Sequence, residues 1–261
     1  MKVLITGAAS GIGEALSKYF LSLGHSVYAL DINDVILDGV ISFKASITDE
    51  DKLNEVKNHL KEKNIVFDSI INVAGIHMMA SLVESDYNKM KRLIDINLCG
   101  TMLVNRVFYE LLNPKGRIVI VTSEVAGFDP MPFNGLYNVS KSALDCYAQA
   151  LRQELNLVGQ KVITIRPGAI QTPLANGSIK DTSLLAETTV LYKKQAHKFS
   201  NIASKFMGTP MKPEKLAKLI YKSTTIKHPK LIYKKHQNLG LVLLNILPKR
   251  LQCFVIKTLL K

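Results

Sequence analysis

The stretch Thr6-Gly7-Ala8-Ala9-Ser10-Gly11-Ile12-Gly13 joins a short aliphatic run, Lys2–Thr6, directly to an amphipathic segment. A strand that turns at once into a helix points the helix's first backbone amides at one place, where they bind a pyrophosphate well. Glycine in the turn lets the backbone and such a ligand approach closely. Because this turn follows a strand and opens a helix, it predicts dinucleotide binding through Thr6, Gly7, Ser10, Gly11, Ile12 and Gly13.

Outward from this turn, aliphatic or β-branched runs alternate with amphipathic stretches. The expected strands are Lys2–Thr6, Ser26–Asp31, Asp68–Val73, Arg117–Thr122, Lys161–Arg166 and Leu231–Tyr233. Their continuous apolar character is typical of strands buried on both faces. The helices expected between and after them are Gly13–Leu23, Asp49–Lys63, Asp86–Leu112, Leu136–Leu157 and Lys212–Ser223. A chain of 261 residues with this alternation predicts a single Rossmann-type α/β domain, a doubly wound parallel sheet in three α/β/α layers.

After Arg166 the alternation ends. Residues 173–211 predict a long excursion with a helix around 183–199, and 236–260 predicts two short helices split by Pro248. An excursion of this length is typical of a lid over a binding site. We therefore divide the domain into a cofactor-binding and catalytic core at 1–172, a substrate lid at 173–211 and a basic C-terminal helical segment at 212–261. The apolar lid residues, which favour a hydrophobic substrate, are Leu184, Leu185, Val190, Leu191, Phe199, Phe206 and Met207.

The second expected strand ends in Asp31, which bears on the choice of dinucleotide. A carboxylate at this place accepts hydrogen bonds from the ribose hydroxyls of NAD and repels the additional phosphate of NADP. Ser10 in the glycine turn is neutral and offers no cation to that phosphate. The sequence therefore favours NAD, and Lys44, if it folded against the site, is the feature that would favour NADP.

Two Tyr-x-x-x-Lys pairs occur, Tyr87 with Lys91 and Tyr137 with Lys141. Residues four apart lie on one face of a helix, so in each pair the ammonium can sit near the phenol. Only the second pair follows a strand that ends in a serine, Ser123. Ligands of open α/β sheets bind beyond the carboxyl ends of the strands, so Ser123 is expected at the site. We interpret Tyr87 and Lys91 as an exposed helix pair.

In order along the chain, six such pieces resemble the short-chain dehydrogenase/reductase family over residues 1–172. They are Thr6-Gly7-x-x-x-Gly11-x-Gly13, Asn72-Val73-Ala74-Gly75, Asn97, Ser123, Tyr137-x-x-x-Lys141 and Pro167-Gly168-Ala169-Ile170-Gln171-Thr172. The resemblance implies an NAD(P)-dependent oxidoreductase acting on an alcohol or ketone, with a catalytic tetrad of Asn97, Ser123, Tyr137 and Lys141. It also implies cofactor contacts at Asn72, Ala74, Gly75, Tyr137, Lys141, Pro167, Gly168, Ile170 and Thr172.

The mechanism that this resemblance implies depends on charge. A free phenol, with a pKa near ~10, is a poor base at neutral pH. The Lys141 cation and the positive nicotinamide of the oxidised cofactor are expected to lower the pKa of Tyr137, which then acts as general acid and base. Ser123 would hydrogen-bond the substrate oxygen. Lys141 would also hold the nicotinamide ribose, and Asn97 would support a water relay.

Four positions depart from the family pattern or stand out beside it. Ser46 occupies the place of an aspartate that usually binds the adenine, which leaves Ile47 to pack on the base, and Val73 replaces a second asparagine. Glu124 follows Ser123 and is either a feature of a Ser-Glu subgroup or an additional acid near the substrate. His77 is interpreted as lining the pocket, with a direct substrate contact as the alternative.

Two other functions remain as alternatives. A non-catalytic dinucleotide sensor or scaffold of the same fold is disfavoured by the intact Ser123, Tyr137 and Lys141. A sugar-nucleotide epimerase is disfavoured by the glycine spacing and by the short chain.

The net charge of +13 is concentrated in the C-terminal part, because residues 193–261 hold 16 lysines and arginines and one acid, Glu214. Near the end this charge flanks an apolar stripe made of Leu251, Phe254, Val255, Leu259 and Leu260. Such a segment predicts packing on its own fold or a partner subunit, or peripheral contact with an anionic membrane. Nucleic-acid binding is not expected, because the lysines alternate with aliphatic residues and not with stacking aromatics.

Cys99, Cys146 and Cys253 have no metal-ligand or redox spacing and predict three partly buried thiols in a reducing compartment. We expect no metal site. The first residues, Met1 to Gly7, do not have the pattern of a signal peptide. The expected protein is a cytoplasmic enzyme, a homodimer or homotetramer acting on a small-molecule substrate.

Overall fold

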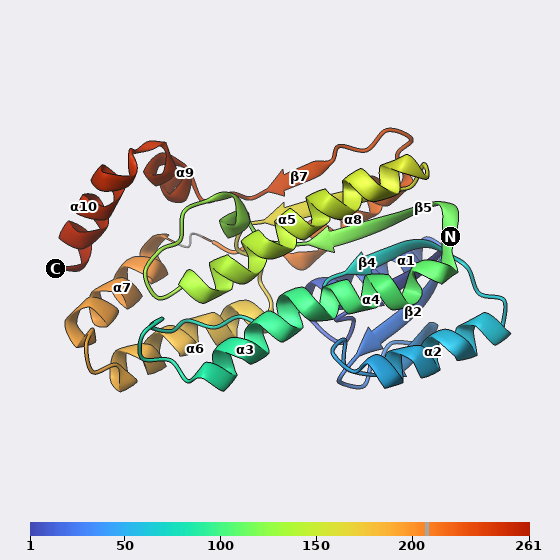
Figure 1. Cartoon of the computed structure of the whole chain (residues 1–261), viewed down its shortest axis with the longest axis horizontal. Coiled ribbons are helices and arrows are strands. Elements are labelled where there is room, and N and C mark those ends of the chain that lie inside the picture. Colours follow the sequence, from blue (N-terminus) through green and yellow to red (C-terminus); the bar gives the residue numbers. More distant parts are fainter. Residues whose placement is uncertain (207–208) are drawn as a thin grey trace.

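Seven strands among the described residues, 1–206 and 209–261, form one parallel sheet in the order β3-β2-β1-β4-β5-β6-β7 in the computed structural model of the chain (Figure 1). Each neighbouring pair runs parallel. The strands are β1 (Lys2–Thr6), β2 (Ser26–Asp31), β3 (Val40–Lys44), β4 (Phe67–Asn72), β5 (Leu112–Val121), β6 (Lys161–Pro167) and β7 (Ile232–Lys235). The predicted doubly wound, Rossmann-type sheet is confirmed.

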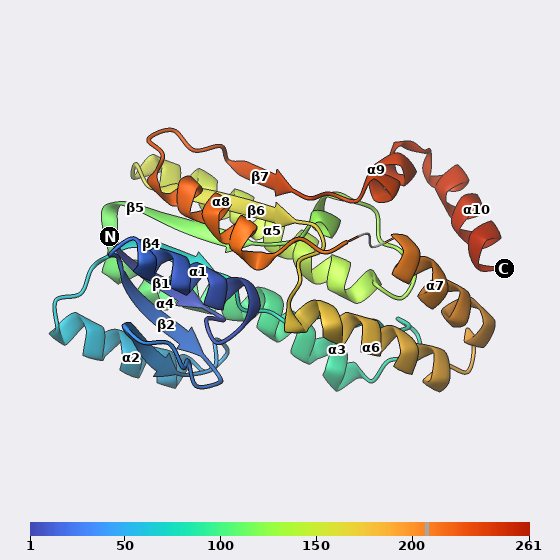
Figure 2. The same ribbon diagram turned by 180° about the vertical axis from the view of Figure 1, so that it is seen from behind.

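Helices cover both faces of the sheet because strand side chains alternate between the faces. Val3 and Ile5 of β1 pack in one apolar cluster with α1 (Gly11–Ser22) and α8 (Pro213–Thr225), which lie in front of the sheet in Figure 2. Leu4 belongs to the cluster on the other face. There the helices are α2 (Glu50–Glu62), α4 (Thr101–Phe108) and α5 (Gly135–Leu157), seen in front in Figure 1. The three expected layers are present.

From β1 the chain first adds β2 and β3 on one side of the sheet. It then returns to place β4 on the other side of β1. Thr6 at the end of β1 lies beside Leu30 of β2 and Asn72 of β4. The connections after β1 and β4 therefore diverge and leave a crevice beyond the carboxyl ends of these two strands. This crevice is where the residues of the candidate site meet.

Two elements differ from the sequence expectations before the excursion. Strand β3 was not expected, because this edge strand is half exposed and Val40–Lys44 lacks a continuous apolar run. The expected helix Asp86–Leu112 is divided into α3 (Tyr87–Ile94), a π-helical turn η1 (Asp95–Gly100), α4 and a short 3-10 turn η2 (Tyr109–Leu111). Its last residue, Leu112, already belongs to β5.

The excursion contains two helices, α6 (Pro173–Thr188) and α7 (Lys193–Phe206), where one was expected around 183–199. Thr172 caps α6 by accepting the backbone N–H of Ala175 at 3.3 Å, and Pro173 occupies its first position. At the base of the excursion, Ile170 and Met211 form a parallel bridge. The side chain of Phe206 and the whole of Met207, both assigned to the apolar lid, lie outside the described residues.

The chain ends in α9 (Leu239–Ile246) and α10 (Lys249–Leu260), which are separated at Pro248 as expected. Both lie at the end of the molecule that also holds α7 and the turn between α6 and α7 (Figures 1 and 2). Leu260 and Ile256 of α10 pack on α7 through Phe199. No helix in 1–206 or 209–261 is long and apolar enough to cross a membrane. All three cysteines are free and exposed, not partly buried as expected.

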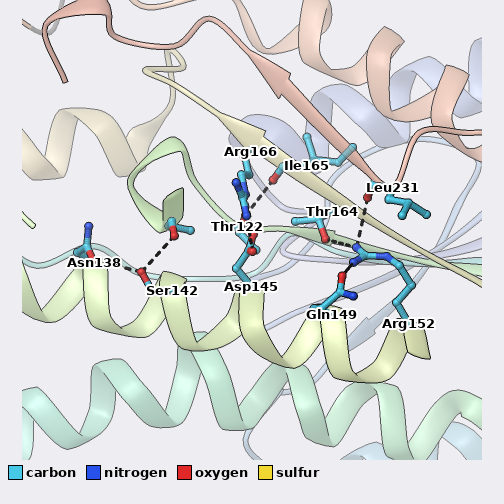
Figure 3. A network of polar contacts seen from close by, with 11 residues as sticks. Thr122, Asn138, Ser142, Asp145, Gln149, Arg152, Thr164, Ile165, Arg166 and Leu231 are labelled. Carbon is cyan, nitrogen blue, oxygen red and sulfur yellow. Dashed lines mark hydrogen bonds and ion pairs between the residues drawn. The ribbon is translucent and has the colours of Figure 1, made fainter. Parts of the chain in front are cut away.

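Polar side chains bind the middle of α5 to the strands beneath it (Figure 3). Asp145 forms an ion pair with Arg166 of β6, and Thr122 donates to the same carboxylate at 3.3 Å. Arg152 donates to the carbonyl oxygen of Val162 at 2.9 Å and to the hydroxyl of Thr164 at 2.7 Å. Because Tyr137 and Lys141 lie on this helix, the network also fixes their height above the sheet.

Candidate active site

Glycine is required at two positions of the turn after β1, where the backbone approaches other backbone atoms. Gly7 has φ +69°, and a Cβ atom on it would lie 2.8 Å from the Cα atom of Ala74. A Cβ atom on Gly13 would lie 2.0 Å from the carbonyl oxygen of Gly7. Thr6 joins the same place, because its hydroxyl oxygen accepts the backbone N–H of Ala74 at 3.2 Å. The glycine turn is thus packed directly against the Asn72–Gly75 segment.

The N-terminus of α1 faces the segment that follows β6. Ser10 precedes α1 without a side-chain capping hydrogen bond, which leaves the helix's first amides for another acceptor. Gly11 has φ +56°, and a Cβ atom on it would lie 3.0 Å from the methyl group of Thr172. A backbone cradle with helix amides, and with no Cβ atom at Gly7, Gly11 and Gly13, fits the pyrophosphate of a dinucleotide.

Asp31 lies at the end of β2 beside this cradle. Its carboxylate accepts the backbone N–H of Ala9 at 3.0 Å and that of Asn33 at 2.9 Å. Lys44, its neighbour on β3, forms an ion pair with Asp34 at 2.9 Å. The cation that could have favoured NADP is therefore already paired with a carboxylate.

Two residues expected on the adenosine side point into the protein. Ile47 is buried and packs under η1, where a Cβ atom on Gly100 would lie 2.7 Å from it. Asn72 is also buried, and its amide nitrogen donates to the amide oxygen of Asn105 at 2.8 Å. The hydroxyl of Ser46 is hydrogen-bonded within its own loop. In this structure the Ile47 and Asn72 side chains support the walls of the site from behind.

Ser123, Tyr137 and Lys141 meet beyond the carboxyl ends of β4 and β5. Ser123 is hydrogen-bonded to the phenol of Tyr137, and Lys141 Nζ lies 5.8 Å from the centre of the tyrosine ring. A Cβ atom on Gly75 would lie 3.3 Å from Lys141 Nζ, so the end of the Asn72–Gly75 segment reaches the same point. The structure thus brings together three of the four expected tetrad residues.

The turn after Ser123 is joined to α5 by two side chains that the sequence analysis did not single out. Asn138 donates to the carbonyl oxygens of Val125 at 2.8 Å and Phe128 at 3.2 Å. Ser142, one turn later, donates to the carbonyl oxygen of Ala126 at 3.4 Å (Figure 3). These bonds set the position of Ser123 relative to Tyr137.

Burial controls the charge of the two titratable groups on α5. It raises the pKa of Tyr137 to about 12, although the hydrogen bond from Ser123 acts in the other direction. Burial also lowers the pKa of Lys141 to about 8. We expected Lys141 and the oxidised nicotinamide together to lower the pKa of Tyr137, but in the protein alone the loss of hydration of the phenolate dominates and raises it.

Asn97, the fourth expected tetrad residue, lies in the π-helical turn η1 and is fully buried. Its side chain exchanges two hydrogen bonds with the backbone of Ile76, at 2.8 and 2.9 Å, and donates to the hydroxyl of Ser140 at 3.0 Å. Asn97 therefore connects the segment after β4 to the helix that carries Tyr137. A widened π turn is a frequent feature of functional sites.

His77 packs on Tyr137, with 4.4 Å between the ring centres. Its Nε2 atom is hydrogen-bonded to the Asn134 side chain at 3.2 Å, and its Nδ1 atom lies 3.8 Å from a carboxylate oxygen of Asp181 in α6. Burial lowers the pKa of His77 against the opposing effect of Asp181. The imidazole thus lies between Tyr137 and the first helix of the excursion.

These groups border a cavity of 540 Å³. Ser123, Tyr137, Lys141 and His77 lie on one side of it, and Ile12 and Thr172 connect it to the glycine cradle. Apolar side chains from the excursion and from the C-terminal helices close the remainder. They are Leu174, Phe199, Ile202, Leu241, Leu243, Leu244, Val255 and Leu259.

Residues 1–183 match the short chain dehydrogenase family. The chain is a short-chain dehydrogenase. It is 34% identical over 180 residues to the NADPH-dependent 1-acyldihydroxyacetone phosphate reductase of Schizosaccharomyces pombe, a match that covers 66% of this chain and 60% of that protein.

Solved structures of other short-chain dehydrogenases share the fold. A 3-ketoacyl-(acyl-carrier-protein) reductase from Brucella melitensis complexed with NADH has a TM-score of 0.70 at 24% identity, over 89% of this chain and 96% of that one. A short-chain dehydrogenase from Burkholderia cenocepacia in complex with NADP has a TM-score of 0.72 at 18% identity, over 100% and 97%.

In this short-chain dehydrogenase Glu124, the residue after Ser123, holds the C-terminal segment in place. Glu124 is buried, and its carboxylate accepts the backbone N–H of Asn238, at the start of α9, at 2.6 Å. Burial raises the pKa of Glu124. Gly168 permits this contact, because a Cβ atom on it would lie 1.8 Å from the carbonyl oxygen of His236. Here Glu124 serves as an anchor for α9.

The structure also places the remaining expected cofactor contacts. Pro167 ends β6, Gly168 and Ile170 follow it, and all three line the cavity. The alternative pair is apart from the site, because Tyr87 is 74% exposed at the start of α3 and Lys91 forms an ion pair with Asp95.

Proposed function

We propose that the dehydrogenase transfers a hydride between NAD(H) and a hydrophobic alcohol or ketone, with Tyr137 as the general acid and base. The observation that carries this proposal is the meeting of Ser123, Tyr137 and Lys141 in a cavity that continues into the glycine cradle. A sensor or scaffold has no need for a buried lysine beside a buried tyrosine, because each group loses hydration there.

Each residue has a separate task in this proposal. The nicotinamide ring of the bound cofactor supplies or accepts the hydride. Tyr137 donates its phenolic proton to the substrate oxygen in reduction and takes it back in oxidation. Ser123 donates a hydrogen bond to the same oxygen, and Lys141 holds a positive charge near the phenol and binds the nicotinamide ribose. Asn97 and the turn that it supports hold the wall behind these groups.

The pKa of about 12 gives Tyr137 the proton that ketone reduction consumes, at any pH in the physiological range. Oxidation needs the phenolate, and the protein must then supply positive charge to stabilise it. Lys141 is the group in position to do so while it is protonated. We infer that these two pKa values favour reduction.

The proposed substrate class follows from the cavity lining. The part beyond Ser123 and Tyr137 is formed by leucine, valine, isoleucine and phenylalanine side chains, which favour an aliphatic or lipid-like compound. His77 is the polar side chain next to Tyr137 that could select an oxygen-bearing group in such a compound.

We propose NAD as the preferred cofactor. Support comes from the Asp31 carboxylate at the end of β2 and from the pairing of Lys44 with Asp34. Related dehydrogenases with solved structures include both NADH and NADP complexes. The preference therefore rests on the charges of this chain alone.

Substitution of Tyr137 tests the proposed function. Tyr137→Phe removes the acid and base but keeps the ring, so turnover of aliphatic ketones by NADH should fall at least about a thousandfold. NADH binding, measured by fluorescence titration, should stay within about threefold because few cofactor contacts are lost.

Tyr87→Phe is the matched control, since it deletes the same hydroxyl from the exposed pair, and it should keep full activity. An inactive Tyr87→Phe enzyme or an active Tyr137→Phe enzyme would overturn the assignment.

A further inference from the structure

Helix α9 presents an apolar face to solvent. Leu239, Leu243 and Ile246 follow one another at spacings of four and three, which places them on one face of the helix. They are 76%, 66% and 73% exposed, and α9 has no buried residue. Leu241 and Leu244 on its other face line the cavity, and Leu243, although 66% exposed, also contributes to the cavity lining. A helix that is apolar on both faces and lies on the outside of the molecule needs a partner for its outer face.

Helix α10 extends this surface with a face that carries both an exposed aromatic side chain and basic side chains. Phe254 is 64% exposed, and Arg250, Lys257 and Lys261 lie within one turn of it or of one another. Lys234 and Lys235 are exposed just before α9. Within residues 1–206 and 209–261, one cation of the C-terminal segment 212–261 forms an ion pair. It is Lys249, which pairs with Asp129. Exposed aromatic and aliphatic side chains flanked by cations are typical of segments that lie in a membrane interface.

The turn between α6 and α7 adds apolar side chains at the same end of the molecule (Figure 1). Val190 and Leu191 in this turn, and Leu184 near the end of α6, are all more than half exposed. The excursion and the C-terminal helices are also the two segments whose inner sides close the cavity. The exposed apolar surface therefore surrounds the part of the molecule that encloses the proposed substrate.

We propose that the outer faces of α9 and α10 dock on an anionic lipid surface. The charge of these two helices favours lipid over a second copy of the chain, because residues 239–261 contain Lys249, Arg250, Lys257 and Lys261 and no acidic side chain, so two such faces would repel each other. Leucine, isoleucine and phenylalanine enter the interface while the lysines and the arginine meet the headgroups. Docking sets the cavity next to the lipid phase, which suits the apolar substrate of the proposed function.

Vesicle co-sedimentation of the full chain tests the docking without any redox assay. The wild type should pellet at least about tenfold better with vesicles of phosphatidylserine and phosphatidylcholine than with phosphatidylcholine alone, and less as salt screens the charge. The variant Leu239→Gln, Ile246→Gln, Phe254→Gln removes exposed apolar groups that lie outside the cavity lining, and it should lose this binding.

The control variant Leu157→Gln, Val158→Gln changes two exposed apolar residues at the end of α5 and should bind like the wild type. Light scattering measures the molar mass in solution and so tests whether a second copy of the chain covers these faces instead. The proposal is overturned if the wild type does not pellet at low salt, if the triple variant pellets as well as the wild type, or if the triple variant turns a dimer into a monomer without changing vesicle binding. The triple variant should also reduce a water-soluble ketone with NADH as fast as the wild type. Loss of vesicle binding with unchanged turnover then distinguishes the docking proposal from the proposed function.

Discussion

At the scale of single residues, the site contains two side chains, Tyr137 and Lys141, whose charged forms are both disfavoured by burial. Burial holds Tyr137 in its protonated form and weakens the hold of Lys141 on its proton. The charge of the lysine is thus the one that changes near physiological pH. The tyrosine stays protonated throughout that range.

This difference predicts the pH dependence of ketone reduction. Below pH of about 8 Lys141 carries its positive charge, and above it the ammonium loses its proton, so kcat/KM should fall as the pH rises through about 8. The measurement is a pH profile of kcat/KM with NADH between pH 6 and 10. Lys141→Met should give a low, flat profile, whereas Ser123→Ala should be slow but keep the inflection. A wild-type inflection near 10.5 would contradict the role of burial.

Cofactor choice is the second residue-scale prediction. Wild-type protein should bind NADH at least about tenfold more tightly than NADPH, and Asp31→Asn should narrow this gap because it removes the charge that repels the 2′-phosphate. The asparagine keeps one oxygen that can accept the backbone N–H of Ala9. Calorimetry measures both affinities, with Asp38→Asn in the following loop as the control. Equal affinities in the wild type would refute the preference.

Single residues were predictable where a local pattern identifies them. The glycine turn, Asp31, Ser123 and the Tyr137 and Lys141 pair were all found from spacing and neighbouring elements. His77, Asn134 and Asp181 were not connected in the sequence, because their contacts join segments far apart in the chain. The inward direction of Ile47 and Asn72 also depends on packing against η1 and α4.

At the scale of elements, α5 depends on a nearly buried ion pair. The side chains of Asp145 and Arg166 are both 15% exposed, so Asp145→Asn leaves the guanidinium with little hydration and no counter-charge. The free energy of unfolding should fall by about 3 kcal/mol, as measured by urea denaturation. Glu14→Gln breaks the exposed pair with Lys18 and should cost less than about 1 kcal/mol. Equal losses for both variants would show that burial does not strengthen the first pair.

Elements were predictable where apolar periodicity is strong and less so elsewhere. All six expected strands are present: Lys2–Thr6 and Ser26–Asp31 have the expected bounds, and the bounds of the other four differ by one to five residues. Strand β3 carries little apolar signal because half of it faces solvent. Helix α6 had a usable signal in Thr172-Pro173, a capping residue followed by a proline at the first helical position. The π turn at Asp95–Gly100 gave none, since its extra residue is accommodated by contacts of Asn97 with other segments.

At the scale of the whole molecule, the C-terminal helices close a cavity that the sheet and the excursion leave open. A chain ending at Gln237 keeps all seven strands, and we expect it to unfold cooperatively in a thermal melt followed by circular dichroism. It loses the inner faces of α9 and α10, so KM for an apolar ketone should rise by roughly tenfold or more. NADH affinity should change little because the cradle lies at the other end of the cavity. A truncated enzyme with unchanged KM would show that α9 does not contact the substrate.

The bridge between Ile170 and Met211 makes the chain between them an insert between β6 and β7. Its two ends meet in space, while the sheet strands on either side continue through β6 and β7 without it. Recombination between Pro173 and Met211 could therefore exchange most of this insert for a segment of different length and keep Thr172 beside the glycine turn. Substrate range and redox chemistry can then evolve on separate stretches of one gene, and a designer can exchange the former while leaving the latter untouched.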